Sequence, residues 1–131
     1  PPRGTQFCFT HNNYTAQQLQ FYNDYFSGNG NGITYAVFGQ EVAPTTGTTH
    51  LQGYVVFEQR KRIGAVRSAF PGAHVEVCRG TPAQNQRYCK KDGQFYGYGD
   101  FYAIPFQGTR PSFALFKDWV DAVSDTYLAL A

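Results

Sequence analysis

Two polar side chains that could hold a metal ion stand two residues apart in the apolar run from Thr49 to Phe57. In a β-strand, residues i and i+2 point to the same face and lie roughly 6.5 Å apart. His50 and Gln52 would therefore offer an imidazole nitrogen and an amide oxygen to one point. Alone the pair is weak evidence, because a histidine at a strand edge is more often a hydrogen-bonded surface residue.

Glu41 supplies a third ligand. It lies at the C-terminal end of the preceding predicted strand, and an antiparallel hairpin would place it beside His50. A carboxylate, an amide oxygen and an imidazole with open positions suit Mg²⁺ or Mn²⁺ better than structural zinc. Glu58 is a rival acid, but it lies too far along its strand from Gln52 to share a metal ion. We predict that Glu41, His50 and Gln52 bind a divalent metal.

Tyr88 and Lys91 could form a second reactive group. They stand three residues apart on a predicted helix, which places them on one face, whereas Lys90 points elsewhere. A tyrosine with its ordinary pKa is a poor nucleophile at neutral pH unless a cation or a metal assists it. Spacing alone also allows structural roles for both residues. Tyr88 could be an ordinary packed aromatic, since this chain has ten tyrosines. Lys91 could be a solvated charge near a helix C-terminus, where it complements the helix dipole.

An α+β fold would position these residues. Alternating, β-branched and aromatic runs predict strands at 5–10, 33–38, 49–57, 74–78 and 94–102. Helical spacing with capping residues predicts helices at 15–27, 61–70, 82–91 and 112–131. The order is a βαββαβ core followed by a helix, a strand and a further helix. This order predicts a mainly antiparallel sheet of about five strands with flanking helices.

Composition favours one compact soluble domain. The 131 residues are 42% hydrophobic, and the sequence has neither a membrane-spanning apolar run nor a secretion signal pattern. We therefore expect an intracellular protein. The cysteines Cys8, Cys78 and Cys89 are odd in number and lack C-x-x-C spacing, so we expect reduced thiols and no disulfide.

Positive charge is concentrated in residues 60–91. Eight Lys or Arg and one Glu give this segment 8 − 1 = +7, so the other residues sum to −5 within the net charge of +2. Such asymmetry is typical of proteins that bind a phosphate backbone. A solvated helix surface is the alternative explanation.

Three motifs in order resemble the HUH endonuclease domain of replication initiator (Rep) proteins of circular single-stranded DNA viruses, closest to circoviruses. They are Phe9-Thr10-His11-Asn12-Asn13, then Glu41 with His50-Leu51-Gln52-Gly53-Tyr54, then the run from Gly80 to Gly93 that contains Tyr88 and Lys91. The resemblance covers residues 5–100. Three ordered motifs are far more specific than any one.

The resemblance implies a metal-dependent nickase and strand-joining enzyme that initiates rolling-circle replication in the host nucleus. Tyr88 would attack the scissile phosphate at a hairpin origin and form a covalent 5′-phosphotyrosine link. Lys91 would assist proton transfer or position phosphate and metal. Glu41, His50 and Gln52 would hold Mn²⁺ or Mg²⁺. The implied contacts to single-stranded DNA are Thr10, Asn12, Asn13, Arg60, Lys61 and Arg62.

The resemblance also bears on domain organisation. Full-length initiators carry a C-terminal helicase domain, and no G-x-x-x-x-G-K-[ST] phosphate loop occurs here. We expect 1–111 to be the endonuclease domain, monomeric by itself, and 112–131 to be its last helix or the start of a linker.

Two residues depart from the general pattern of the family. Gln52 replaces a second histidine. His11, which we expect at the surface or facing DNA, replaces an apolar residue.

Two other functions fit parts of the sequence. A βαββαβ sheet rich in aromatics is also the form of non-catalytic RNA-recognition modules, but their basic-Gly-aromatic-Gly-aromatic run is absent. A metal-dependent nuclease that uses water in place of Tyr88 would form no covalent intermediate.

Overall fold

The structure, a computed structural model, describes residues 3–105. Its strands are β1 (Arg3–Asn12), β2 (Ile33–Val42), β3 (Thr49–Arg62), β4 (His74–Val77) and β5 (Phe95–Gly99). Its helices are α1 (Ala16–Ser27), α2 (Ile63–Ala69) and α3 (Pro82–Lys90), and a short 3₁₀ turn, η1 (Phe101–Ala103), follows β5. The predicted helix at 112–131 lies outside the described residues.

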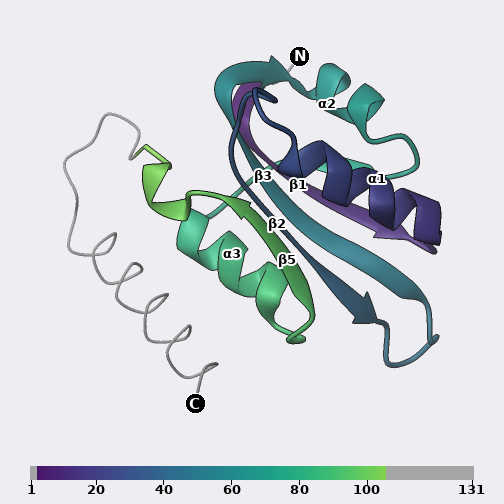
Figure 1. The fold of residues 1–131 in the computed structure, drawn as a ribbon. Coiled ribbons are helices and arrows are strands. Elements are labelled where there is room, and N and C mark those ends of the chain that lie inside the picture. The colour runs from purple at the N-terminus through teal and green to yellow at the C-terminus, as the bar shows by residue number, and fades with distance from the viewer. Residues whose placement is uncertain (1–2, 106–131) are drawn as a thin grey trace.

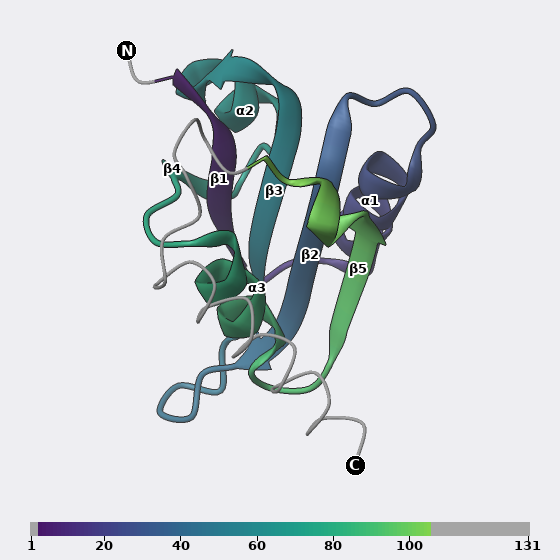
Figure 2. The same ribbon diagram turned by 90° about the vertical axis from the view of Figure 1, so that its left-hand side faces the viewer.

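The five strands form one antiparallel sheet in the order β4-β1-β3-β2-β5. Figure 1 shows the twisted sheet with α1 and α2 on one side and α3 on the other. In Figure 2, α3 lies in front of the sheet and α1 behind it. The predicted α+β class and the antiparallel sheet are confirmed.

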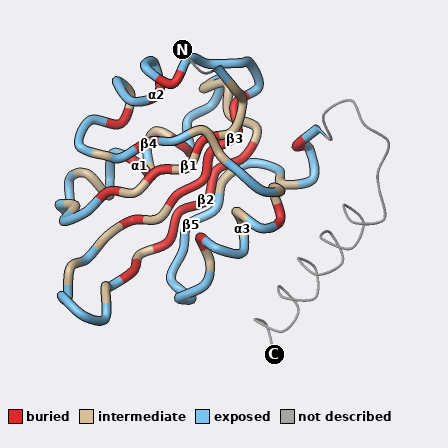
Figure 3. The backbone as a smooth tube through the Cα atoms, turned by 180° about the vertical axis from the view of Figure 1, so that it is seen from behind, coloured by how far each residue is buried: buried red, intermediate tan, exposed pale blue. Residues whose placement is uncertain are grey.

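The two faces of the sheet have different contents because alternate residues of a strand point to opposite sides. The face under α1 and α2 holds the main core, which includes Phe7, Phe9, Phe38, Val66 and Phe70. Figure 3 shows the buried residues concentrated along the central strands. On the α3 face, a smaller core of Val37, Tyr54, Val56, Cys89 and Ile104 leaves one end of the sheet free for polar side chains.

Capping residues fix where two helices begin. Thr15 caps α1 and Thr81 caps α3, and each forms a full capping box with the glutamine three residues later. Pro82 occupies the first turn of α3, where its missing N–H costs nothing. These caps confirm the predicted starts of both helices.

The predicted start of α2 is wrong by two residues. Lys61 and Arg62 belong to β3, because Arg62 pairs with Arg3 and Lys61 pairs with Gly4 across the ladder to β1. The helix begins only at Ile63. The basic run Arg60-Lys61-Arg62 therefore lies at the end of a strand.

The expectation of three reduced thiols is also wrong. Cys8 and Cys78 form a disulfide with a Cα–Cα distance of 5.3 Å, which lies in the usual range. Pairing of β4 with β1 brings them together, since the Cys78 N–H donates to the Gln6 carbonyl at 3.0 Å. Cys89 is free and buried, and burial raises the pKa of its thiol to about 12.

No helix within residues 3–105 is long and apolar enough to cross a membrane.

Candidate functional site

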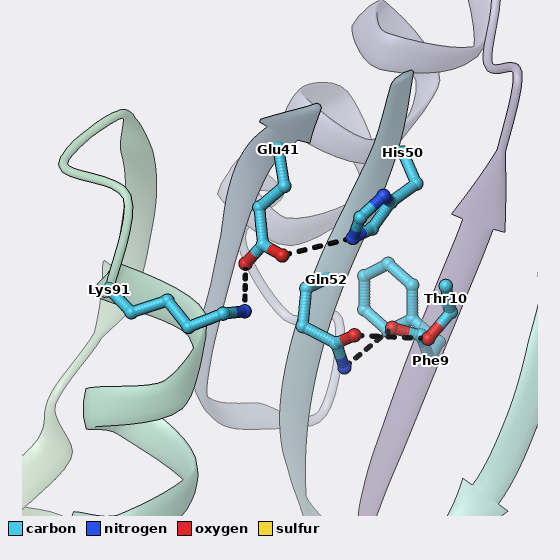
Figure 4. A network of polar contacts seen from close by, with 6 residues as sticks. All are labelled: Phe9, Thr10, Glu41, His50, Gln52 and Lys91. Atoms are coloured by element: carbon cyan, nitrogen blue, oxygen red, sulfur yellow. Dashed lines mark hydrogen bonds and ion pairs between the residues drawn. The ribbon is translucent and has the colours of Figure 1, made fainter. Parts of the chain in front are cut away.

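A buried carboxylate and an imidazole meet where β2 ends and β3 begins. Glu41 and His50 are direct partners in the antiparallel register. The His50 Nε2 atom lies 2.9 Å from Glu41 Oε1, and Glu41 is only 7% exposed. Figure 4 shows the two side chains turned toward each other. The hairpin argument from the sequence is confirmed for this pair.

Lys91 brings a positive charge to the same carboxylate. Its Nζ atom donates to Glu41 Oε2 at 2.5 Å, so the two oxygens of Glu41 contact different partners (Figure 4). Gly39 allows α3 to lie this close, because a Cβ atom there would stand 2.1 Å from the Cys89 carbonyl oxygen. A buried carboxylate with two such partners keeps its negative charge at lower cost.

Tyr88 is held beside Lys91, as predicted from their spacing. The Lys91 Nζ atom lies 3.8 Å from the centre of the Tyr88 ring, a cation–π contact. Tyr88 is nonetheless 54% exposed, which leaves the side chain accessible to a large substrate. Lys90 points elsewhere, over the ring of Phe95. Contacts thus run from Tyr88 through Lys91 and Glu41 to His50.

Gln52 lies on the same face but turns away from the Glu41–His50 pair. Its Oε1 atom accepts a hydrogen bond from the Thr10 hydroxyl at 3.1 Å, and its Nε2 atom donates to the Phe9 carbonyl at 3.5 Å. Figure 4 shows the carboxamide directed toward β1. The structure therefore brings Glu41 and His50 together and places Gln52 next to them with its oxygen engaged by Thr10.

The donor set fits a hard divalent cation. A carboxylate oxygen, an imidazole nitrogen and an amide oxygen are ligands that suit Mg²⁺ or Mn²⁺, and Glu41 and His50, whose Oε1 and Nε2 atoms contact each other at 2.9 Å, would supply the first two. Within residues 3–105 no three His, Cys, Asp or Glu side chains form a metal-binding group. Gln52 would supply the third ligand, because its Oε1 atom keeps a second lone pair beside its bond from Thr10.

The other predicted DNA contacts are spread over the molecule. Asn12 pairs with His50 across β1 and β3 and is exposed. Asn13 follows it, also exposed, in a left-handed conformation with φ of 55°. Arg60, Lys61 and Arg62 are exposed at the opposite end of β3. The first-motif residues therefore border the Glu41–His50 pair, whereas the basic run does not.

His11 is not a surface residue, which corrects our expectation. It is 4% exposed on the α1 face of β1, and its Nδ1 atom lies 2.6 Å from the Tyr22 hydroxyl. Burial lowers the pKa of His11 because a charged ring would lose its hydration. The side chain points away from the α3 face, so it cannot contact a ligand there.

Sequence reasoning missed two contacts that organise the site. The ion pair between Lys91 and Glu41 depends on how α3 docks, and only the glycine at position 39 hinted at a close approach. The hydrogen bond from Thr10 to Gln52 follows from the pairing of β1 with β3. Strand order was not readable from the sequence, so the Thr10–Gln52 contact had no signal of its own and the Lys91–Glu41 contact had only Gly39.

Comparison with known proteins finds relatives that are all viral or satellite replication proteins. A family model described as "Putative viral replication protein" matches residues 4–92. The chain is 32% identical to the Replication-associated protein of Human associated cyclovirus 1 over 127 residues, which are 96% of this chain and 43% of that protein. It is 39% identical to the Replication-associated protein of Beak and feather disease virus over 67% of this chain and 29% of that protein.

A third relative comes from a satellite. The Para-Rep C2 of Milk vetch dwarf C2 alphasatellite is 40% identical over 88 residues, 66% of this chain and 30% of that protein. This chain thus spans less than half the length of each of these relatives. The match over residues 4–92 includes Glu41, His50, Gln52, Tyr88 and Lys91. With the antiparallel α+β fold and the motif order, it shows that the chain belongs to the viral replication protein family.

Proposed function

We propose that this domain nicks and rejoins single-stranded DNA through a covalent bond to Tyr88, and so initiates rolling-circle replication. The observation that carries the proposal is the line of contacts from an exposed tyrosine through Lys91 and Glu41 to His50. A tyrosine with only a packing role would not need a lysine beside its ring that also contacts a buried carboxylate, as Lys91 does here. The names of the relatives, replication-associated proteins, agree with this role.

The phenol oxygen of Tyr88 would attack the scissile phosphorus in line. The new bond joins phosphorus to the tyrosine oxygen, and the bond to the 3′ oxygen breaks. The phenol proton ends on the departing 3′ oxygen, which leaves a 3′-hydroxyl that can prime synthesis. Attack by a 3′-hydroxyl on the phosphotyrosine reverses these steps and joins the ends.

Lys91 and the predicted ligands would support this step. The Lys91 ammonium contacts both the Tyr88 ring and Glu41, so its charge stabilises the phenolate as the proton leaves. Glu41, His50 and Gln52 would hold Mn²⁺ or Mg²⁺, whose chemistry is to polarise the phosphate and offset developing negative charge. Exposure of Tyr88 suits a splayed single strand better than a closed small-molecule pocket.

Membership of the family supports a proposal for the biological setting. We propose that the substrate is a hairpin origin with an exposed single-stranded loop, that the reaction takes place in the host nucleus, and that a helicase domain accompanies this domain in the intact protein. The curated relatives are longer than the matched region, which leaves room for further domains in them.

The test is covalent capture. The protein is mixed with single-stranded origin DNA of a related circovirus and Mn²⁺, and adducts are resolved under denaturing conditions. We expect an adduct with the wild type and none with Tyr88→Phe or with EDTA. Tyr102→Phe is the matched control, because Tyr102 is also exposed, at 68%, and lies on η1, away from Lys91.

Other results would replace the proposal. An adduct that persists in Tyr88→Phe would move the nucleophile to another residue. Nicked product without an adduct would indicate a nuclease that uses water. DNA binding that is unchanged by EDTA, with no product at all, would support a non-catalytic binding module.

A further inference from the structure

A pocket of about 550 Å³ lies at the opposite end of α3 from Tyr88 and Lys91. It forms where β1 starts, where β3 ends and where the chain passes from β4 to α3. Figure 2 shows the start of β1 and the end of β3 close together, beyond the N-terminal end of α3. The lining residues that carry polar groups include Arg3, Thr5, Gln6, Arg60 and Gly80. None of the lining residues is acidic.

The pocket is rich in hydrogen-bond donors. Neither Arg3 nor Arg60 forms an ion pair with any residue in the described range 3–105. The Gln6 Oε1 atom accepts a hydrogen bond from the Tyr54 hydroxyl at 2.8 Å, so the two N–H groups of its carboxamide remain for a ligand. Two guanidinium groups and an amide donor favour an anion, and the planar fork of arginine matches phosphate oxygens.

The pocket and the Tyr88 site share one face of the sheet. Gln6 and Thr10 are four residues apart on β1 and point to the same side, which separates them by roughly 13 Å. The nine residues of α3 span a similar distance, about 13 Å. A strand whose bases stay stacked between the two sites rises about 3.4 Å per nucleotide, so this distance corresponds to about four nucleotides even where the base beside Tyr88 is splayed out.

The neighbouring basic side chain behaves differently. Lys61 turns to the opposite face of the sheet, where its Nζ atom lies 5.5 Å from the centre of the Phe57 ring. The run Arg60-Lys61-Arg62 is therefore not a uniform solvated patch, and only Arg60 of the three lines the pocket. Arg3 reaches the same pocket from β1, although it is distant from this run in sequence.

We propose that the Arg3–Arg60 pocket binds a phosphodiester group of the substrate strand, about four nucleotides from the phosphate attacked by Tyr88. The inference rests on the proposed function for its choice of strand. The pocket would fix the register of the strand along α3, so that one phosphate is presented to Tyr88.

The first experiment measures binding without chemistry. A fluorescent single-stranded oligonucleotide that spans both sites is titrated in EDTA with the wild type, Arg3→Gln, Arg60→Gln and Lys61→Gln. Each of the three variants removes one positive charge, and Arg60 and Lys61 are neighbours in sequence. We expect each pocket variant to weaken binding by roughly tenfold and to reduce the salt slope by about 0.7. Lys61→Gln should change affinity by less than about threefold. Equal losses in all three variants would overturn the pocket.

The second experiment locates the phosphate. Single phosphates of the oligonucleotide are replaced one at a time by neutral methylphosphonates. In the wild type, one replacement about four nucleotides from the nick should weaken binding, and the same replacement should cost nothing further in Arg60→Gln. Losses that add fully at every position would show that Arg60 touches no particular phosphate and would contradict the proposal.

Adduct formation and DNA affinity test the nicking function and the Arg3–Arg60 pocket separately. If wild type forms the Tyr88 adduct while Arg3→Gln and Arg60→Gln bind DNA normally, the pocket inference fails and the nicking function stands. If no adduct forms but both pocket variants lose affinity in EDTA, the nicking function fails and the pocket remains a DNA phosphate site. Inorganic phosphate that shifts pocket resonances at millimolar concentration, without any dependence of DNA affinity on Arg60, would identify a free-anion site and overturn the assignment to DNA.

Discussion

The side chains of the candidate site constrain one another more than their spacing indicates. Glu41 binds His50 through one oxygen and Lys91 through the other, and Lys91 in turn lies on the Tyr88 ring. A change in any one of them therefore alters the charge seen by the others. Gln52 is outside this line and is held by Thr10.

Thr10 should act on metal binding through Gln52. Its hydroxyl donates to the Gln52 oxygen, and residues that orient a metal ligand typically change affinity by about 10-fold to 100-fold. We predict that Thr10→Val weakens Mn²⁺ binding by roughly 10-fold, measured by calorimetry on the DNA-free protein. Thr10→Ser keeps the hydroxyl and should bind Mn²⁺ as the wild type does. Equal affinity in Thr10→Val would show that Gln52 needs no such support.

His11 should make stability depend on pH. Burial lowers its folded-state pKa from 6.5, so the unfolded chain takes up a proton at a higher pH than the folded chain does. The contribution of neutral His11 to the free energy of unfolding is therefore fully present above about pH 6.5. It is lost as the pH drops toward the folded pKa, by at most about 1.4 kcal/mol per pH unit.

Urea unfolding from pH 8 to pH 5 tests this for the wild type and for His11→Gln, which keeps a neutral hydrogen-bonding group. The other groups titrate in both proteins, and the hydroxyl of Tyr22, with its pKa raised by burial to about 12, stays neutral throughout. We expect the variant to lose less stability on acidification. Parallel pH profiles would exclude His11 as the source.

The docking of α3 depends on the missing side chain at Gly39. A Cβ atom would stand 2.1 Å from the Cys89 carbonyl oxygen, a backbone atom that cannot simply rotate away. We predict that Gly39→Ala lowers the free energy of unfolding by roughly 1–3 kcal/mol and displaces Lys91 from Glu41. Adduct formation should fall further than the folded fraction does. Gly97→Ala is the control, because its Cβ would meet nothing within 4 Å.

The disulfide should tie β1 to the end of β4. A bridge between residues 70 apart removes about 4 kcal/mol of loop-closure entropy from the unfolded state in the chain-entropy model. We predict that dithiothreitol lowers the urea midpoint of the wild type but not that of Cys8→Ser/Cys78→Ser. Native protein should show no thiol that reacts rapidly, since Cys89 is buried. Rapid labelling of two thiols in untreated protein would contradict the bridge.

The sequence was most informative where a pattern is local. Caps at Thr15 and Thr81 and the alternation around Phe7 and Phe9 depend on neighbours within a few residues, and both patterns were confirmed. The side of the sheet on which His11 lies was also implied by its odd position beside Phe9. Its burial depends on α1, which the alternation of one strand does not reveal.

Contacts between elements distant in the chain were less predictable. The hairpin made the Glu41–His50 pair predictable, because one turn fixes its register. The Cys8–Cys78 bridge needs β4 beside β1, and the Lys91–Glu41 pair needs α3 over β2. Both depend on the order of strands and on packing, which composition and spacing leave open.

Across the described residues 3–105, the main core and the candidate site occupy opposite faces of one sheet. The main core lies under α1 and α2, whereas Glu41, His50, Gln52 and α3 lie on the other face. The strands between them are shared, so the separation is one of side chains and not of backbone. Substitutions far from the strands should therefore affect one property without the other.

Substitutions at Val66 in the main core and at His50 in the candidate site should separate effects on stability from effects on adduct formation. Val66 is 2% exposed on α2 in the main core, and Val66→Ala should lower the free energy of unfolding by about 2 kcal/mol. Well below its urea midpoint, its rate of adduct formation should stay within about twofold of the wild type, because distant effects are usually independent. His50→Ala should abolish the adduct while its midpoint moves less. A Val66→Ala protein that is fully folded yet slow to form the adduct would show that the core sets the geometry of the site through the shared strands.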